Sequence, residues 1–261
     1  MIDLHCHILW GIDDGPQTVD DSLALARAAV AAGTSLIVAT SHVSWAHRND
    51  SATIAARVGE LNERLAAEGI QLEVRPGAEI AATLAGEIAP EELARLSIGG
   101  AGGGWLLIEP PFTPVVTGLD SLIYSLQRDG YRILLAHPER AGAFHRDRAM
   151  LEALVAAGVY TSITAGSLVG RFGKPVRRFA LELVRDGLVH NVASDAHDAV
   201  RRPPGVAAEI EQAGLQELAD WLARAVPEAI LNDEEIPPRP FFSSKPPSDE
   251  RRLTRWLPHR G

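Results

Sequence analysis

The sequence of 261 residues predicts a parallel α/β fold that closes as a barrel. Short apolar stretches alternate with longer helical patterns along most of the chain, which is the order expected of repeated strand-then-helix units. The apolar stretches are continuous and do not alternate with polar residues, as in strands buried on both faces. The length suits one α/β barrel, and the 46% of hydrophobic residues can fill one sizeable core.

Seven apolar stretches are predicted strands. In chain order they span 2–4, 36–39, 72–75, 105–108, 133–136, 160–163 and 189–192. Helices are predicted between most of them, because the intervening segments carry helical patterns and are followed closely by glycine, a common residue just after a helix. These helices span 19–32, 52–67, 119–128, 146–157 and 176–186.

Composition narrows the classes of partner and compartment. A formal net charge of −9 disfavours binding to nucleic acid or to an anionic membrane surface, although bound metal ions can still attract an anionic substrate. Cys6 is the only cysteine, so an intrachain disulfide is excluded, which fits a cytoplasmic protein. The sequence shows no signal peptide and no apolar run of about 20 residues, so we expect no membrane insertion.

Histidine, aspartate or glutamate, the residue types that commonly bind metals, follows six of the seven predicted strands. In a parallel α/β barrel the carboxyl ends of the strands meet at one face, where sites form. A single histidine or glutamate at a strand end is usually a hydrogen-bonded surface residue. The presence of such a residue after six of the seven strands is hard to ascribe to chance. The residues are His5, His7, His42, Glu79, Glu109, His137, Asp195 and His197.

Two pairs in this set have the spacing i, i+2. His5 and His7, like Asp195 and His197, share one face of an extended chain. Imidazole and carboxylate ligands suit Mn, Fe, Zn or Co, and the number of candidate ligands implies two or three ions, with Glu79 as a natural bridging carboxylate. Cys6 lies between the two histidines and is expected to face the barrel wall, either as a core residue or as a residue that supports the metal ligands from behind.

Two arginines are candidates for binding phosphate. Arg140 follows His137 in the order His-Pro-Glu-Arg, and Arg202 lies five residues after His197. A guanidinium group presents a planar fork of donors that matches phosphate oxygens. The simpler alternative for each arginine is a surface ion pair.

The composition changes near the C-terminus. Residues 237–261 are rich in proline and arginine and carry a net charge of +4 from residue 239 onward, six Lys/Arg against two Asp/Glu. We therefore expect one barrel domain over residues 1–236 and a basic, poorly packed tail over 237–261. An alternative role for this tail is contact with an acidic partner or with a neighbouring subunit of a homo-oligomer.

With these motifs in place, the sequence resembles the PHP (polymerase and histidinol phosphatase) superfamily and, within it, the CpsB/CapC-type bacterial protein-tyrosine phosphatases. The resemblance runs from Met1 to about Asn232. It rests on MIDLHCHILWGIDDG, IVATSH, PGAEI, LLIEPP, LLAHPER, TAGSLVGRFGK and ASDAH followed by RP. One departure is Thr40-Ser41-His42-Val43, where the family usually has TPHH, so the loop geometry at this strand end is expected to differ.

The resemblance implies a distorted TIM-like (β/α)7 barrel with a trinuclear metal centre. It implies one metal site at His5, His7, Glu79 and Asp195, a second at Glu79, Glu109 and His137, and a third at Asp14, His42 and His197. Arg140 and Arg202 match phosphate-contacting positions. The implied activity is removal of phosphate from tyrosine in a bacterial tyrosine kinase that regulates capsule or exopolysaccharide synthesis, with manganese as the first choice of metal.

Three other functions compete with this interpretation. The first is a PHP phosphoesterase acting on histidinol phosphate or a nucleotide. The second is an amidohydrolase, which shares the HxH pair on a barrel, but no lysine follows a middle strand here, since Lys174 lies in a loop-to-helix segment. The third is a binding module with a degenerate centre, which the complete ligand set disfavours.

Overall fold

The computed structural model describes residues 1–100 and 104–242. Its strands form two parallel sheets. The smaller sheet has the order β1 (Ile2–Cys6), β2 (Leu36–Ala39) and β4 (Glu73–Pro76). The larger sheet has the order β3 (His42–Val43), β5 (Glu79–Ala81), β6 (Trp105–Glu109), β7 (Arg132–Ala136), β8 (Tyr160–Thr164) and β9 (Asn191–Ala193).

All seven predicted strands are present, with ends within two residues of those expected, and the mixed α/β fold with parallel sheets is confirmed. The sequence did not indicate β3 and β5, because strands of two and three residues are too short to produce a pattern. They continue β2 and β4 after a turn. A Cβ atom at Gly77, in the second of these turns, would lie 2.5 Å from Cγ1 of Val38, so only glycine fits there.

This change of direction positions the site. After the turns, β3 pairs with β5 in a register that places His42 opposite Glu79. Two residues predicted as metal ligands therefore become cross-strand neighbours on the larger sheet.

The single closed barrel predicted from the sequence is not confirmed, because the strands belong to two sheets rather than one closed sheet. The end of β1 nevertheless lies beside the segment that follows β9. Cys6 forms an isolated bridge with Ala196, the Asp195 N–H donates to the His5 carbonyl at 2.8 Å, and the His7 N–H donates to the Ala196 carbonyl at 2.9 Å. Two strand ends that carry candidate ligands are thus joined directly.

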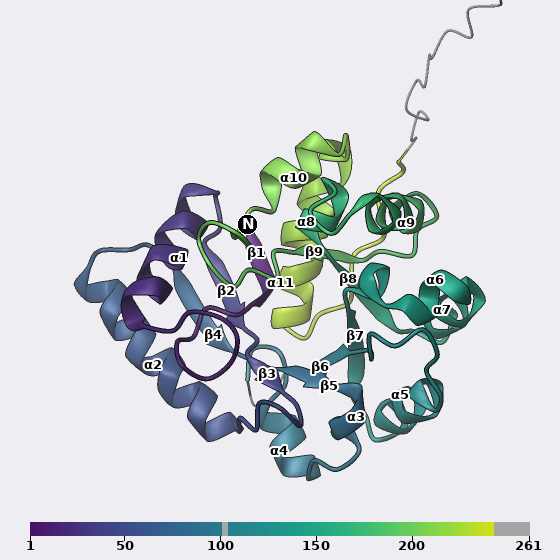
Figure 1. Cartoon of the computed structure of the whole chain (residues 1–261), viewed down its shortest axis with the longest axis horizontal. Coiled ribbons are helices and arrows are strands. Elements are labelled where there is room, and N and C mark those ends of the chain that lie inside the picture. The colour runs from purple at the N-terminus through teal and green to yellow at the C-terminus, as the bar shows by residue number, and fades with distance from the viewer. Residues whose placement is uncertain (101–103, 243–261) are drawn as a thin grey trace, which may run out of the picture.

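The five predicted helices are confirmed within two residues at each end. They are α1 (Val19–Ala31), α2 (Ser51–Ala67), α5 (Leu119–Arg128), α7 (Arg148–Ala156) and α9 (Lys174–Arg185). Figure 1 shows them outside the strands, as expected for crossover helices of parallel strands. Side-chain caps fix where several begin, since Thr18, Asp50 and Asp147 each accept a hydrogen bond from the backbone N–H three residues later, in the first turn.

Shorter helical segments fill the connections. They are α3 (Ala82–Ala85), α4 (Pro90–Arg95), η1 (Pro138–Arg140), α6 (Gly142–Arg146), α8 (Ala165–Leu168), α10 (Ala207–Gln212), η2 (Gln216–Leu218), η3 (Trp221–Ala225) and α11 (Val226–Leu231). One continuous hydrophobic core joins the strands to the helices. Within residues 1–100 and 104–242, no helix combines the length and apolarity needed to cross a bilayer.

The first residues of the predicted tail contact the body of the protein. The Trp221 indole N–H donates to the Pro237 carbonyl at 2.9 Å, and the Arg239 guanidinium donates to the Val184 carbonyl at 2.7 Å. Phe242 is partly buried against the core. The rest of the predicted tail, residues 243–261, lies outside the described residues.

His190, just before β9, is expected to make stability depend on pH. Its Nδ1 accepts a hydrogen bond from the Thr161 N–H at 3.2 Å, and burial, with help from Arg239, lowers its pKa to about 4. The folded state therefore favours the neutral ring. Its contribution to stability is complete above the ordinary histidine pKa of 6.5 and is lost as the pH falls from 6.5 towards 4.

The variant His190→Asn keeps an acceptor at this position and removes the titration. Between pH 7.5 and pH 5, the free energy of unfolding of the wild type should fall by about 2 kcal/mol more than that of the variant. Urea unfolding of both proteins at the two pH values measures this difference. Equal losses in the two proteins would show that His190 does not titrate on unfolding.

Candidate metal centre

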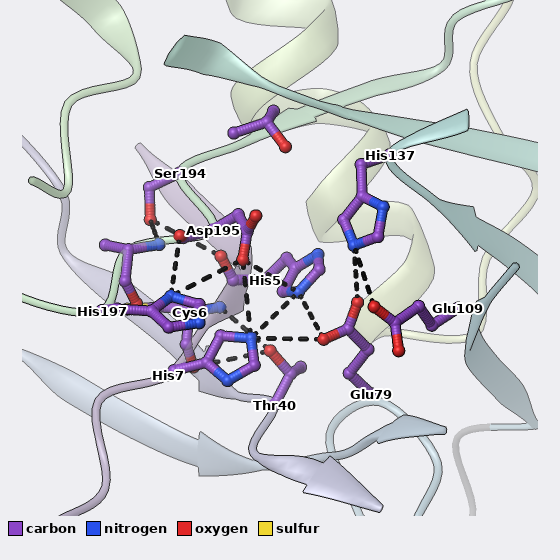
Figure 2. A network of polar contacts seen from close by, with 12 residues as sticks. His5, Cys6, His7, Thr40, Glu79, Glu109, His137, Ser194, Asp195 and His197 are labelled. Atoms are coloured by element: carbon purple, nitrogen blue, oxygen red, sulfur yellow. Dashed lines mark hydrogen bonds and ion pairs between the residues drawn. The ribbon is translucent and has the colours of Figure 1, made fainter. Parts of the chain in front are cut away.

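The structure brings together all nine residues that the sequence and its resemblance singled out as metal ligands. Seven lie at the carboxyl ends of parallel strands or in the loops that follow them, and His42 and Glu79 begin the short strands β3 and β5 that continue β2 and β4. Figure 2 shows most of them around one centre, contributed by segments far apart in the chain. The nine candidate ligands are His5, His7, Asp14, His42, Glu79, Glu109, His137, Asp195 and His197.

The donor atoms form four overlapping sets, and within each set they lie within 4.8 Å of one another. The sets are His7, Asp14, His42 and His197; His5, Glu79 and His137; His5, His7 and Asp195; and His42, Glu79 and Glu109. These sets share most members with the three predicted sites but divide them differently: His7 joins the set of Asp14, and Glu109 groups with His42. The assignment of individual ions to residues stays a prediction.

The Glu79 carboxylate is the centre of the cluster. Its Oε2 lies 3.3 Å from Nε2 of His5, 3.3 Å from Nε2 of His7 and 3.0 Å from Nδ1 of His42. Three imidazole nitrogens therefore approach one oxygen, yet this buried oxygen has no hydrogen bond of acceptable geometry. The other oxygen, Oε1, lies 2.8 Å from Nε2 of His137. A carboxylate approached in this way is suited to bridging cations.

The donor set fits divalent metal ions on further grounds. Nε2 of His5 and Nε2 of His7 lie only 3.3 Å apart, and a pair of neutral rings can satisfy such a contact only when one nitrogen donates and the other accepts. Nδ1 of His137 is buried without a hydrogen-bond partner. Buried polar atoms without partners are rare in native proteins and call for an explanation such as an ion. No lysine among the described residues joins this donor set, because the one lysine among them, Lys174, is exposed at the start of α9.

Asp195 has two different environments for its two oxygens. Oδ1 lies 3.5 Å from Nε2 of both His5 and His7. Oδ2 accepts hydrogen bonds from Nη1 of Arg140 and, at 2.6 Å, from Nη2 of Arg202. One buried carboxylate thus stands between the histidine cluster and two guanidinium groups, so the predicted phosphate-binding arginines border the predicted metal ligands.

The part of the site around Asp14 is more exposed to solvent than the rest. Oδ1 of Asp14 lies 3.2 Å from Nε2 of His197 and 3.5 Å from Nε2 of His42. The Asp14 side chain is 51% exposed, whereas those of His5, His7 and Glu79 are almost fully buried. The cluster therefore has a buried floor and an accessible side at Asp14.

Backbone strain is concentrated at the same place. His137 and Asp195 have positive φ values of 30° and 50°, which non-glycine residues rarely adopt. The His137 N–H still donates to the Ser162 carbonyl at 2.7 Å, and the Asp195 N–H donates to the His5 carbonyl, so neighbouring strands hold both residues. Such strain is commonly found at functional sites, where it aims a side chain.

The pKa shifts of Glu79 and His7 reflect the attraction between a carboxylate and imidazole rings at the centre of the cluster. Burial alone would raise the pKa of Glu79, but the surrounding histidines hold it well below its usual value. Burial favours the neutral form of His7, yet the carboxylates of Asp13 and Glu79 raise its pKa well above the usual value. By contrast, burial lowers the pKa of His137 to about 4, and burial together with the charge of Glu79 raises the pKa of Glu109 to about 7.

The sequence reasoning missed Asp13, which neighbours the predicted ligand Asp14. Its buried Oδ2 lies 2.9 Å from Nδ1 of His7 and accepts the His42 N–H at 3.1 Å, while Oδ1 accepts the Gly15 N–H at 3.0 Å. Asp13 therefore fixes the ring orientation of His7, as carboxylates behind metal-binding histidines commonly do. The doubled aspartate in GIDDG was the available signal, but it does not tell which of the two faces the cluster.

Cys6 is buried at 0% exposure, as expected for a core residue, and its Sγ lies 3.8 Å from the Ala196 carbonyl. Burial, reinforced by nearby carboxylates, raises the pKa of its thiol well above the usual value, which opposes formation of a thiolate nucleophile. We expect Cys6→Ser to retain most hydrolytic activity. A variant that keeps its metal content but loses activity would instead assign the thiol a chemical role.

Parallel strands with a histidine- and carboxylate-rich donor cluster at their carboxyl ends define a class of α/β proteins suited to binding metal ions. The chain belongs to the family described as Capsular polysaccharide synthesis, CpsB/CapC, which matches residues 1–232. This match confirms the resemblance drawn from the sequence motifs.

Two relatives that the chain resembles are named as tyrosine-protein phosphatases. The chain is 41% identical over 203 residues to Tyrosine-protein phosphatase YwqE of Bacillus subtilis, covering 77% of this chain and 79% of that protein. It is 33% identical over 205 residues to Putative tyrosine-protein phosphatase CapC of Staphylococcus aureus, covering 78% and 79%.

Solved structures extend the comparison. A crystal structure from work on YwqE of Bacillus subtilis and CpsB of Streptococcus pneumoniae, described as metal-dependent tyrosine phosphatases, superposes with a TM-score of 0.80 at 37% identity, covering 93% of this chain and 100% of that one. The lactonase Lmo2620 of Listeria monocytogenes, at 11% identity and a TM-score of 0.51, shares the fold alone.

Proposed function

We propose that the chain is a metal-dependent protein-tyrosine phosphatase. The observation that most supports this function is the position of Asp195. One of its carboxylate oxygens faces the histidine cluster, and the other accepts hydrogen bonds from two arginines. Membership of the CpsB/CapC family and the relatives named as tyrosine phosphatases support this assignment. The substrate we infer is a bacterial tyrosine kinase that regulates capsule or exopolysaccharide synthesis.

The nine clustered residues are proposed to hold two or three divalent ions, with manganese first and iron, zinc or cobalt also compatible with the ligands. Bound ions would supply Lewis-acid charge to the phosphoryl oxygens. The unpartnered Oε2 of Glu79 and Nδ1 of His137 support this assignment. Asp13 keeps Nε2 of His7 directed into the cluster by holding the opposite nitrogen.

Arg140 and Arg202 are proposed to bind the phosphoryl group. Each uses few of its five N–H donors on Asp195, and Nε of Arg202 is buried without a partner. Donors left free beside the cluster can hold phosphoryl oxygens and stabilise the charge that develops on them during hydrolysis. Because the only cysteine is buried with a raised pKa, we propose direct hydrolysis without a phosphoenzyme.

We also propose how the two sheets are organised, what the C-terminal residues do and where the protein acts. We propose that the two sheets work as one distorted TIM-like (β/α)7 barrel over residues 1–236, supported by the hydrogen bonds between the ends of β1 and β9. Residues 237–261 are proposed to form a basic extension, and the protein is proposed to act in the cytoplasm. Contact of this extension with an acidic partner or a second subunit is its proposed role.

A side-by-side assay tests the function. A tyrosine-phosphorylated peptide, histidinol phosphate and a dinucleotide are offered to protein that was treated with a chelator and then supplied with Mn, Fe, Zn or Co. We expect the peptide to be hydrolysed fastest, with activity absent in chelator and restored by a divalent metal. Faster hydrolysis of histidinol phosphate or the dinucleotide would contradict the assignment, as would full activity in chelator.

A further inference from the structure

The Arg140 guanidinium contacts two phenylalanine rings that the site described above does not use. Its guanidinium carbon is 4.4 Å from the centroid of the Phe172 ring and 5.3 Å from that of Phe112. A guanidinium group over an aromatic face is held by attraction to the ring and by stacking. Together with the bond to Asp195, these contacts fix the position of Arg140.

The two rings differ in what else they touch. Phe172 is partly buried in the loop after α8. Phe112 follows β6, three residues after Glu109, and is 49% exposed. The Phe112 ring also stacks on the ring of His137, with centroids 5.3 Å apart and planes 17° apart. An exposed ring of Phe112 thus contacts both the arginine and the metal-ligand cluster.

Other exposed aromatic side chains have different surroundings. Trp45 donates its indole N–H to the Thr83 carbonyl at 3.2 Å and stacks with Arg48. Tyr124 is 43% exposed on α5. Phe241, at 92% exposure, follows α11 near the C-terminal end of the described residues. Phe112 is the exposed ring that contacts both Arg140 and His137, so it is positioned to meet a group attached to a phosphoryl bound between Arg140 and the cluster.

We propose that Phe112 contacts the aryl ring of the substrate and makes the site prefer aryl phosphates to alkyl phosphates. The inference rests on the proposed function, because it assumes that Arg140 binds the phosphoryl group. In phosphotyrosine the aromatic ring is joined to phosphorus through a single oxygen, so it must lie beside the bound phosphoryl group. Phe172, whose ring lies closer to the Arg140 guanidinium, is a positioning residue for Arg140.

The expected selectivity follows from aromatic contact. An aryl ring packed against Phe112 gains the area and the ring–ring attraction of an aromatic pair, whereas the short alkyl chain of phosphoserine leaves Phe112 largely uncovered. Aromatic pairs of this kind correspond to about 2- to 12-fold in affinity. This preference concerns binding and is separate from the better leaving-group ability of phenolate.

Competitive inhibition by phenylphosphonate and methylphosphonate isolates this contact. Both carry the same phosphonate group, and neither has a leaving group. We expect Phe112→Ala to lower the ratio of the methylphosphonate inhibition constant to the phenylphosphonate inhibition constant by about 2- to 12-fold, because only phenylphosphonate loses a ring contact, whereas weaker support of Arg140 affects both inhibitors alike. Phe112→Tyr should retain the ratio, Phe172→Ala should weaken both inhibitors alike, and the exposed-aromatic control Tyr124→Ala should change neither.

An unchanged ratio in Phe112→Ala, or equal weakening of both inhibitors, would overturn the inference. Phe112→Leu provides a second variant that keeps the apolar volume without the ring, and it should also lose part of the ratio. Metal content and melting temperature are measured for every variant. The proposed function fails separately, if the wild type does not hydrolyse a tyrosine-phosphorylated peptide at all.

Discussion

Replacing Glu79 with glutamine is expected to lower kcat/KM on a tyrosine-phosphorylated peptide by at least about a thousandfold, because the metal-derived charge stabilisation it supports is worth several kcal/mol and each 1.36 kcal/mol is tenfold in rate. Glu79 is the residue whose oxygens approach four histidines. Glutamine keeps the size of the side chain but removes the charge needed to hold cations at the centre of the cluster.

The matched control is Glu63→Gln, which removes one carboxylate from the exposed face of α2. This control should keep both metal content and activity, whereas Glu79→Gln should lose bound metal while remaining folded by circular dichroism. Normal activity and normal metal content in Glu79→Gln would show that the histidine cluster is not organised around this carboxylate.

Alanine at Arg140 or at Arg202 is expected to reduce kcat/KM by about 10²–10³-fold, by analogy with loss of one donor to a developing oxyanion. The structure also predicts how the metal content of these variants should change. Both arginines hold Oδ2 of Asp195, so either one alone keeps this carboxylate in place and the single variants should retain metal. The double variant leaves a buried carboxylate without its guanidinium partners and should lose metal as well.

Two further variants separate binding geometry from charge. Lysine at either position should rescue activity only in part, because it keeps the charge but not the planar fork. Arg201→Ala is the matched control, since Arg201 is adjacent in sequence, 89% exposed and paired only loosely with Asp198 at 3.6 Å. If Arg140→Ala and Arg202→Ala behave like this control, the two arginines are structural ion-pair residues and not part of the site.

The sequence predicted which residues lie at strand ends, and this largely located the cluster. His5 and Glu109 lie at the carboxyl ends of apolar strands and His137 directly follows one, and parallel strands bring these ends to one face. His42 and Glu79 were predicted on the same basis. Their direct pairing depends on β3 and β5, whose two and three residues carry no periodic signal.

Other features depend on loop conformation and side-chain direction, which local patterns do not encode. Asp13 and Asp14 are neighbours in sequence, yet one orients His7 from behind and the other faces His197. The arginines were expected near phosphate, but their shared bond to Asp195 links segments 55 and 7 residues apart. The aromatic contacts of Arg140 with Phe112 and Phe172 likewise join three separate loops.

The central claim is that the nine clustered residues hold the metal ions on which hydrolysis depends. Anomalous diffraction from crystals of active, manganese-loaded protein tests it most directly. We predict two or three manganese peaks among the four donor sets, with adjacent ions about 3.5–4 Å apart. Manganese peaks located elsewhere in fully active protein, with the space between Glu79, Asp195 and Asp14 free of metal, would contradict the account.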